Sequence, residues 1–151
     1  MTEAGSADPA ETTDVPYSEM LIAPMRREMT AMGATELKTA AAVDEAVKNT
    51  RGTLMIVVNS VCGCAAGKAR PGIGMAMRHA RRPDVLATVF AGADIEATDR
   101  ARSYFAGYAP SSPSIGILKD GKLVYMLERR DIEPRSAEMI ADELTNAFER
   151  L

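Results

Sequence analysis

The sequence has few of the residues that build metal sites and disulfide frameworks, since it contains two cysteines and one histidine among 151 residues. A structural zinc site usually needs four cysteine or histidine ligands, which these three residues do not supply within one chain. The same scarcity excludes a small fold held together by several disulfides. With 46% apolar residues, a chain of this length instead predicts one domain whose core is large enough to fold without such cross-links.

The sequence also lacks a strong charge of one sign and long apolar runs. Its 18 basic and 21 acidic side chains leave a net charge of −3, with no basic patch and no acidic tail, so we expect no nucleic-acid partner. The apolar stretches are much shorter than the roughly 20 residues that span a membrane. Residues 1–9 lack the basic start and apolar centre of a secretory signal. We therefore expect a cytoplasmic protein with no membrane partner, and the sequence leaves its oligomeric state open.

Residues 1–16 are small, polar and acidic, with two prolines, and predict a flexible tail ahead of a domain at 17–151. Within the domain, capping residues and hydrophobic periodicity set the element boundaries. Asp120-Gly121 is typical of a tight hairpin turn. The expected elements are helices at 18–33 and 39–49, a strand at 53–59, a helix at 64–80, a strand at 85–90, a helix at 98–107, strands at 115–118 and 123–127, and a helix from 136.

This order predicts an α/β fold with a central mixed β-sheet flanked by helices. A thioredoxin-like three-layer sandwich satisfies it. Such a fold has its redox centre at the turn from the 53–59 strand into the next helix. Pro113, just before the hairpin, then falls where the fold has a cis-proline. A cis-proline there would leave a backbone edge on which an extended substrate can bind.

The two cysteines occupy that turn as Cys62-Gly63-Cys64. A helix N-terminus carries partial positive charge, which favours the thiolate, the form that attacks disulfides. A disulfide needs its Cα atoms about 4.4–6.8 Å apart, whereas residues i and i+2 of an extended chain are about 6.6–7.2 Å apart. Gly63 makes the necessary bend feasible. We expect a strained, easily reduced disulfide with a potential above the roughly −270 mV of thioredoxin.

Position suggests roles for the two thiols. Cys62, at the strand end, is expected to be the exposed nucleophile, and Cys64, inside the first turn, the less accessible resolving thiol. The alternatives are two buried thiols without chemistry, or a Cys-x-Cys metal-binding module that captures a soft metal or shares a site across a dimer. Lys68 and Arg70 are expected to be solvated helix surface that could add positive potential. The lone His79 is expected to be a surface or helix-end residue.

Several stretches resemble the bacilliredoxin family, which has a thioredoxin-like fold. The similarity runs from about residue 18 to 150, and the string from Asn59 to Gly67 is specific, unlike an isolated Cys-x-Cys. The stretches are Pro24-Met-Arg-Arg-Glu28, Val57-Val-Asn-Ser-Val-Cys-Gly-Cys-Ala-Ala-Gly67, Ala69-Arg-Pro71, Thr88-Val-Phe-Ala-Gly92, Tyr104-Phe-Ala-Gly107, Ala109-Pro-Ser-Ser-Pro-Ser114 and Asp120-Gly121.

The resemblance implies a thiol–disulfide oxidoreductase that reduces mixed disulfides between proteins and bacillithiol, a small thiol that some bacteria use instead of glutathione. Cys62 attacks the bacillithiol sulfur and holds the adduct, which Cys64 or a second bacillithiol clears. Bacillithiol is then a co-substrate, no cofactor is tightly bound, and the partners are S-bacillithiolated or disulfide-bonded proteins. The alternative is a general disulfide isomerase or reductase that does not depend on bacillithiol.

Further residues are expected to support the cysteines by lining the site or binding substrate. Some relatives carry another cysteine near the carboxyl end, whereas this chain ends in Ala147-Phe-Glu-Arg-Leu151 and offers no third thiol. Resolution is therefore left to Cys64 or an external thiol. The supporting residues are Asn59, Ser60, Gly63, Ser112 and Pro113, and no metal ligand is expected.

Overall fold

The structure, a computed structural model, describes residues 17–151, so the predicted tail at 1–16 lies outside the described part. Serine and threonine side chains cap three of the helices, with Ser18, Thr39 and Ser136 each accepting a backbone N–H of the first turn. The elements are α1 (Glu19–Thr30), β1 (Thr35–Glu36), α2 (Ala40–Asn49), β2 (Thr53–Asn59), η2 (Ala65–Ala69), α3 (Arg70–Ala76), β3 (Val85–Phe90), α4 (Ile95–Ser103), β4 (Ser114–Lys119), β5 (Lys122–Leu127), α5 (Arg129–Ile132) and α6 (Ala137–Glu149).

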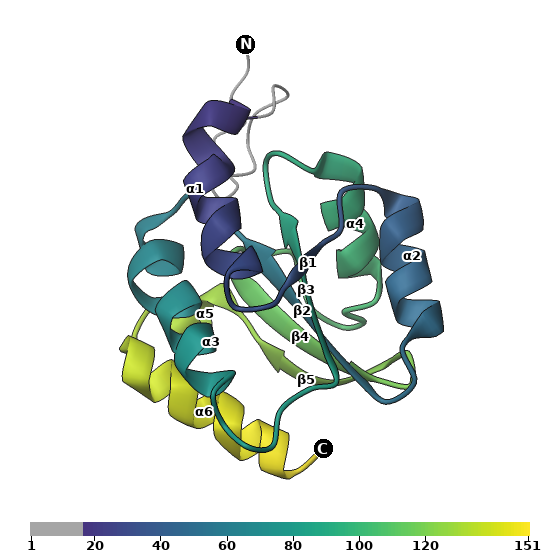
Figure 1. The fold of residues 1–151 in the computed structure, drawn as a ribbon, viewed down its shortest axis with the longest axis vertical. Helices are drawn as coiled ribbons and strands as arrows, with labels where there is room; N and C mark the ends of the chain where they lie inside the picture. The colour runs from purple at the N-terminus through teal and green to yellow at the C-terminus, as the bar shows by residue number, and fades with distance from the viewer. Residues whose placement is uncertain (1–16) are drawn as a thin grey trace.

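The five strands form one mixed sheet in the order β1-β3-β2-β4-β5. β3 runs parallel to β1 and β2, while β4 is antiparallel to both β2 and β5. Helices α3 and α6 pack together over one face, and α2 and α4 pack together over the other (Figure 1). The predicted three-layer α/β sandwich with a central mixed sheet is confirmed. Among residues 17–151, no helix is long and apolar enough to cross a membrane.

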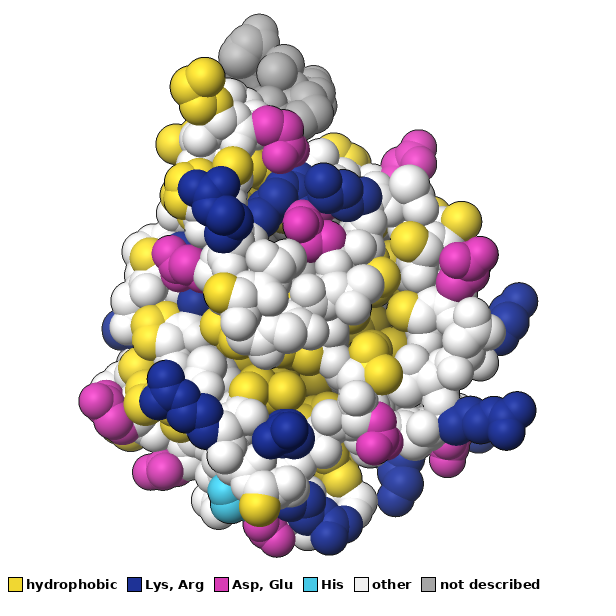
Figure 2. Space-filling model, in the orientation of Figure 1, with side chains coloured by type: hydrophobic (Ala, Val, Ile, Leu, Met, Phe, Trp, Pro, Cys, Tyr) yellow, Lys and Arg dark blue, Asp and Glu magenta, His cyan; other side chains and the backbone are white. Residues whose placement is uncertain are grey.

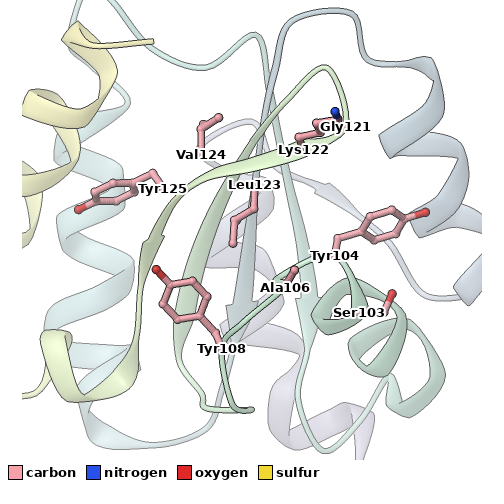
Figure 3. Close-up of a pocket in the computed structure, with 9 residues that line it drawn as sticks. All are labelled: Ser103, Tyr104, Ala106, Tyr108, Gly121, Lys122, Leu123, Val124 and Tyr125. Carbon is pink, nitrogen blue, oxygen red and sulfur yellow. The ribbon is translucent and has the colours of Figure 1, made fainter.

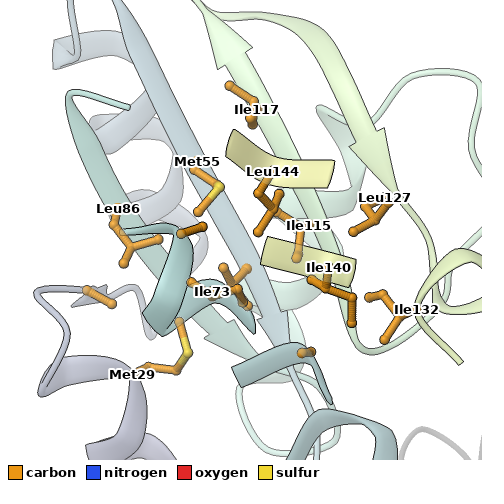
Figure 4. Close-up of a cluster of buried hydrophobic side chains, with 14 of the residues drawn as sticks. Met29, Met55, Ile73, Leu86, Ile115, Ile117, Leu127, Ile132, Ile140 and Leu144 are labelled. Carbon is orange, nitrogen blue, oxygen red and sulfur yellow. The ribbon is translucent and has the colours of Figure 1, made fainter. Parts of the chain in front are cut away.

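β2 is buried along its whole length, as its unbroken apolar sequence predicts. Met55 and Val57 join the core beneath α3 and α6, while Leu54, Ile56 and Val58 join the core beneath α2 and α4. Figure 4 shows the first of these cores, with side chains of α3 and α6 packed over β2 and β4. The strand that leads to the cysteines is therefore fixed from both sides.

Some predicted boundaries are wrong. The helix expected at 64–80 is instead the π-helical η2 followed by α3. Pro71 lies in the first turn of α3 and does not end this helix. Proline is tolerated at such a position because its backbone has no N–H to donate and its fixed φ angle suits the start of a helix. α4 begins after Asp94 rather than at Thr98, whose hydroxyl is buried.

Two short elements were not predicted. β1 has two residues and α5 has four, too few for hydrophobic periodicity to show in the sequence. α5 is stabilised by a reciprocal capping box, in which the side chains of Glu128 and Asp131 each accept a backbone N–H from the other's residue. This small helix follows β5 and becomes important at the site.

Gly72 allows α3 to approach α6 closely. A Cβ at this position would lie 2.8 Å from Cγ2 of Ile140 and 2.9 Å from the carbonyl oxygen of Ala137. Gly74, two residues along the same helix, has space, because its nearest neighbour would be Cε of Met32 at 3.6 Å. The contact at Gly72 fixes the position of the helix that continues from the cysteines.

The two glycines predict opposite effects on stability. Gly72→Ala should lower the free energy of unfolding by about 1–3 kcal/mol, because the added methyl group clashes with α6. Gly74→Ala should raise it by up to about 1 kcal/mol, because alanine favours the helix. Urea unfolding of both variants measures the difference, and equal effects at the two positions would contradict the close approach.

Candidate active site

The sheet register brings the two predicted segments of the site to one edge. β2 ends at Asn59, and the cysteines follow it directly. β4 begins at Ser114, which pairs with Val58, so the residues just before Ser114 run back alongside the residues just after Val58. We call residues 110–113 the Pro113 loop. The Ser112–Pro113 peptide bond is cis, as the position of this proline predicted.

Cys62 and Cys64 are free thiols whose sulfur atoms lie 2.8 Å apart. Both side chains are half-buried, so the structure does not show the predicted contrast between an exposed Cys62 and a shielded Cys64. Gly63 is exposed, and no atom lies within 4 Å of the place of a Cβ. While the two cysteines are reduced, a side chain at position 63 would meet no steric obstacle. A need for glycine at this position would therefore arise only when Cys62 and Cys64 form a disulfide.

Electrostatics separate the two thiols. Burial raises the pKa of Cys62, but this is outweighed by hydrogen bonding to the Cys64 thiol, the Ser60 hydroxyl and the backbone N–H of Ala65, and by the charge of Arg129, so its pKa falls below that of an ordinary thiol. Burial, then the hydrogen bond and charge of Cys62, raise the pKa of Cys64 to about 11. The arrangement favours a thiolate at Cys62 beside a protonated Cys64.

Arg70 holds the cysteine loop from beneath. Its side chain is 3% exposed, and its Nη1 donates to Oδ1 of Asn59 at 2.8 Å and to the carbonyl oxygen of Ser60 at 3.0 Å. Nε of the same guanidinium donates to Oε1 of Glu28 at 2.7 Å. The expectation that Arg70 is solvated helix surface is therefore wrong. The π-helical turn of η2 adds a residue before Arg70 and so changes the side of the helix on which it lies.

Asn59 and Ser60 continue this network to the nucleophile. Ser60 N–H donates to Oδ1 of Asn59 at 2.9 Å, and Cys62 N–H donates to Oγ of Ser60 at 3.1 Å. Nδ2 of Asn59 donates to the carbonyl oxygen of Met25 in α1 at 3.2 Å. Both predicted supporting residues thus fix the backbone conformation of the loop.

On the opposite side of the site lies Arg129, which the sequence analysis missed because α5 was not predicted. Its Nη1 donates to the carbonyl oxygen of Ser112 at 3.1 Å, and its Nε donates to Oε2 of Glu133 at 2.9 Å. Lys68 of η2, also expected as solvated surface, donates to the carbonyl oxygen of Glu133. These contacts tie α5 to both the Pro113 loop and η2. They also engage the Ser112 carbonyl, which is one group of the backbone edge on which an extended substrate was expected to bind.

A groove lies elsewhere on the surface. It has a volume of about 510 Å³ along β5 and the segment after α4, and none of the predicted site residues lines it. Tyr108 and Leu123 flank it, while Tyr104 points toward α2 (Figure 3), where its hydroxyl donates to Asp44. Three tyrosines and one lysine are among the residues that line this groove, but no cysteine is, so the groove offers no group for thiol–disulfide exchange.

The remaining polar groups form no second centre. Across residues 17–151, no three histidine, cysteine, aspartate or glutamate side chains are placed to hold a metal ion. His79 lies after α3, and its Nε2 is 2.6 Å from Oε2 of Glu149. On the face shown in Figure 2, basic and acidic side chains intermingle and form no patch of one sign.

Arg70→Lys should lower the free energy of unfolding by about 1–3 kcal/mol, because an ammonium group does not reproduce the planar fork that serves Asn59, Ser60 and Glu28. It should also slow alkylation of Cys62 by iodoacetamide at pH 7, since the loop loosens. The control is Arg78→Lys, which makes the same substitution at an exposed arginine. Equal stability of the two variants in urea would show that Arg70 does not hold the loop.

Comparison with known proteins identifies the family. The disulphide isomerase family model matches residues 17–151. The bacilliredoxin of Koribacter versatilis is 60% identical over 134 residues, which cover 89% of this chain and 92% of that protein. The bacilliredoxin of Cytophaga hutchinsonii is 52% identical over 135 residues, covering 89% of this chain and 99% of the relative. A Bacillus cereus bacilliredoxin is 52% identical over 124 residues, covering 82% of this chain and 85% of the relative.

Solved structures show the same fold. Thioredoxin of Fasciola hepatica superposes with a TM-score of 0.52 at 19% identity, covering 77% of this chain and 97% of that one. Mitochondrial thioredoxin 3 of Saccharomyces cerevisiae gives a TM-score of 0.54 at 18% identity, covering 82% and 99%. With this fold and these relatives, the chain belongs to the bacilliredoxin family and is a thiol–disulfide oxidoreductase with a thioredoxin-like fold.

Proposed function

We propose that Cys62 and Cys64 are the redox centre and that the protein reduces mixed disulfides between protein thiols and bacillithiol. This proposal rests on one observation: the sulfur atoms of Cys62 and Cys64 lie 2.8 Å apart, and the pKa of the Cys62 thiol is lowered while that of the Cys64 thiol is raised. A nucleophile must be a thiolate at working pH, whereas a resolving thiol can stay protonated until the adduct has formed. The relatives named bacilliredoxin favour bacillithiol as the small thiol.

The reaction begins when the Cys62 thiolate attacks the bacillithiol sulfur of the mixed disulfide. The bond between the two sulfurs of the substrate breaks, the protein leaves as a thiolate that takes up a proton, and a Cys62–bacillithiol disulfide forms. Cys64 then loses its proton and attacks the Cys62 sulfur, which expels bacillithiol and leaves a Cys62–Cys64 disulfide. Alternatively a second bacillithiol attacks the adduct, which yields bacillithiol disulfide and regenerates the Cys62 thiolate.

The surrounding residues support these steps. Asn59 and Ser60 fix the loop, and Gly63 lets the two cysteines close into a disulfide. Ser112 and Pro113 form the opposite wall. Bacillithiol acts as co-substrate and external thiol, with no tightly bound cofactor. We also place the protein in the cytoplasm, because reducing conditions there keep such a thiol pair available for chemistry.

A general disulfide reductase or isomerase is the second candidate, favoured by the description of the family model as disulphide isomerase. It uses the same dithiol but makes no distinction between bacillithiol and other thiols. A metal-binding module fits less well. Two thiols without a further ligand in residues 17–151 do not match the donor set of a structural zinc site.

Cys64→Ser should trap the first intermediate. Incubated with a bacillithiolated test protein, this variant should gain the mass of bacillithiol at Cys62 while the test protein is freed, and a glutathionylated test protein should react more slowly. Cys62→Ser is the matched control and should gain nothing. Equal transfer from both substrates would favour the general reductase, and no adduct on Cys62 would overturn its assignment as nucleophile.

The hydrogen bond between the thiols predicts a pH effect. Because only the thiolate reacts, the rate of Cys62 alkylation by iodoacetamide should rise with pH to a midpoint below that of an ordinary thiol. Cys64→Ser keeps a hydroxyl donor beside Cys62, whereas Cys64→Ala removes it and should move the midpoint to higher pH. Identical profiles for these two variants would mean that the neighbouring donor does not stabilise the thiolate.

A further inference from the structure

The Pro113 loop is the place where an extended chain would dock beside the nucleophile. The register that pairs Ser114 with Val58 carries this loop past the end of β2, next to the cysteine segment. A peptide that adds to such a loop as a strand needs backbone acceptors and donors that its own backbone can pair with. The carbonyl of Ser112, directly before Pro113, is one such acceptor on this loop.

Two carbonyls of the loop, those of Ser111 and Ser112, are already engaged by arginines. Ser111 O accepts from Nη2 of Arg102 at 3.0 Å and from Oγ of Ser114 at 3.0 Å. Ser112 O accepts from Nη1 of Arg129 at 3.1 Å, and Oγ of Ser111 accepts the backbone N–H of Arg129 at 3.3 Å. The Ser112 side chain is fully buried.

Arg129 is held in this position from two directions. Its ion pair with Glu133 spans one turn at 2.9 Å, and Glu133 in turn receives the Lys68 hydrogen bond from η2. The side chain of Arg129 is 27% exposed. A charge-assisted bond from a guanidinium to a carbonyl is stronger than the neutral amide bond that an incoming strand would offer.

We propose that Arg129 determines substrate class by closing the strand-docking edge beside Cys62, so that the site accepts a small thiol on Cys62 more readily than an extended peptide. This inference rests on the proposed function, because it takes Cys62 as the nucleophile. In the proposed first step the moiety that becomes bonded to Cys62 is bacillithiol, which needs no strand pairing. A peptide in the same place must displace Arg129 from Ser112.

The test compares three thiol-containing groups, each joined by a disulfide bond to the same leaving group. Mixed disulfides of thionitrobenzoate with 2-mercaptoethanol, with bacillithiol and with an extended cysteine-containing peptide are each reacted with the protein in the Cys64→Ser background. Release of the coloured thionitrobenzoate gives the rate, and intact mass shows which moiety is bonded to Cys62. Arg129→Gln removes the charge and the guanidinium fork, Arg129→Lys keeps the charge, and Arg130→Gln is the control at a neighbouring position that is 82% exposed.

The ratio of the peptide rate to the 2-mercaptoethanol rate is the quantity that decides. It should rise roughly tenfold in Arg129→Gln, the expected size for loss of one hydrogen bond from a charged group, rise less in Arg129→Lys and stay unchanged in Arg130→Gln. Loss of the Arg129 charge should lower the reactivity of Cys62 toward both substrates by the same factor, and this factor cancels in the ratio. An unchanged or lower ratio in Arg129→Gln would overturn the proposal.

Two further results keep the inference separate from the proposed function. If bacillithiol reacts no faster than 2-mercaptoethanol while the peptide ratio still rises, Arg129 sets substrate class and the preference for bacillithiol fails. Circular dichroism of each variant checks folding. If Arg129→Gln does not fold, Arg129→Lys decides, because its shorter, single-headed side chain should still raise the ratio, and an unchanged ratio there overturns the proposal.

Discussion

The structure of the site depends on one buried guanidinium. Arg70 reaches the end of β2 from α3 and satisfies both the Asn59 amide oxygen and the Ser60 carbonyl, groups that are buried and would be costly to leave unpaired. Asn59 extends the same network to α1, and Ser60 extends it to Cys62. The position of the nucleophile is therefore set by two helices, α1 and α3, and by the strand β2 through a single cation, rather than by the loop itself.

Two chemically identical thiols acquire different properties from this setting. Hydrogen bonds from Ser60, Ala65 and Cys64 lower the pKa of Cys62. Burial and the neighbouring Cys62 sulfur raise the pKa of Cys64. A protonated Cys64 therefore stabilises the thiolate of Cys62 by donating a hydrogen bond to it, and the thiolate of Cys62 in turn favours the protonated form of Cys64. The pair behaves as one titrating unit, and deprotonation of the second thiol becomes favourable once the first is tied up in an adduct.

Much of this arrangement follows from local sequence. An apolar run followed by Cys-Gly-Cys predicts β2 and its dithiol, and the Pro-Ser-Ser-Pro stretch before a hairpin predicts the loop opposite. The two arginines do not follow, for a physical reason. The inward orientation of Arg70 depends on the π-helical η2, and Arg129 lies on a four-residue helix held by a capping box. The positions of both arginines are fixed by contacts with segments distant in sequence, and the hydrophobic periodicity of a sequence does not reveal such contacts.

Three arginines together shape what the site can recognise. Arg70 satisfies the Ser60 carbonyl on one wall, and Arg102 and Arg129 satisfy carbonyls of Ser111 and Ser112 on the other. Walls whose acceptors are already engaged gain little from pairing with an incoming backbone, because each new bond must replace an existing charge-assisted one. Recognition then falls to the sulfur chemistry of Cys62 and to the shape and charge of what is attached to it. A site of this kind suits a substrate that differs from protein to protein and shares only its small thiol.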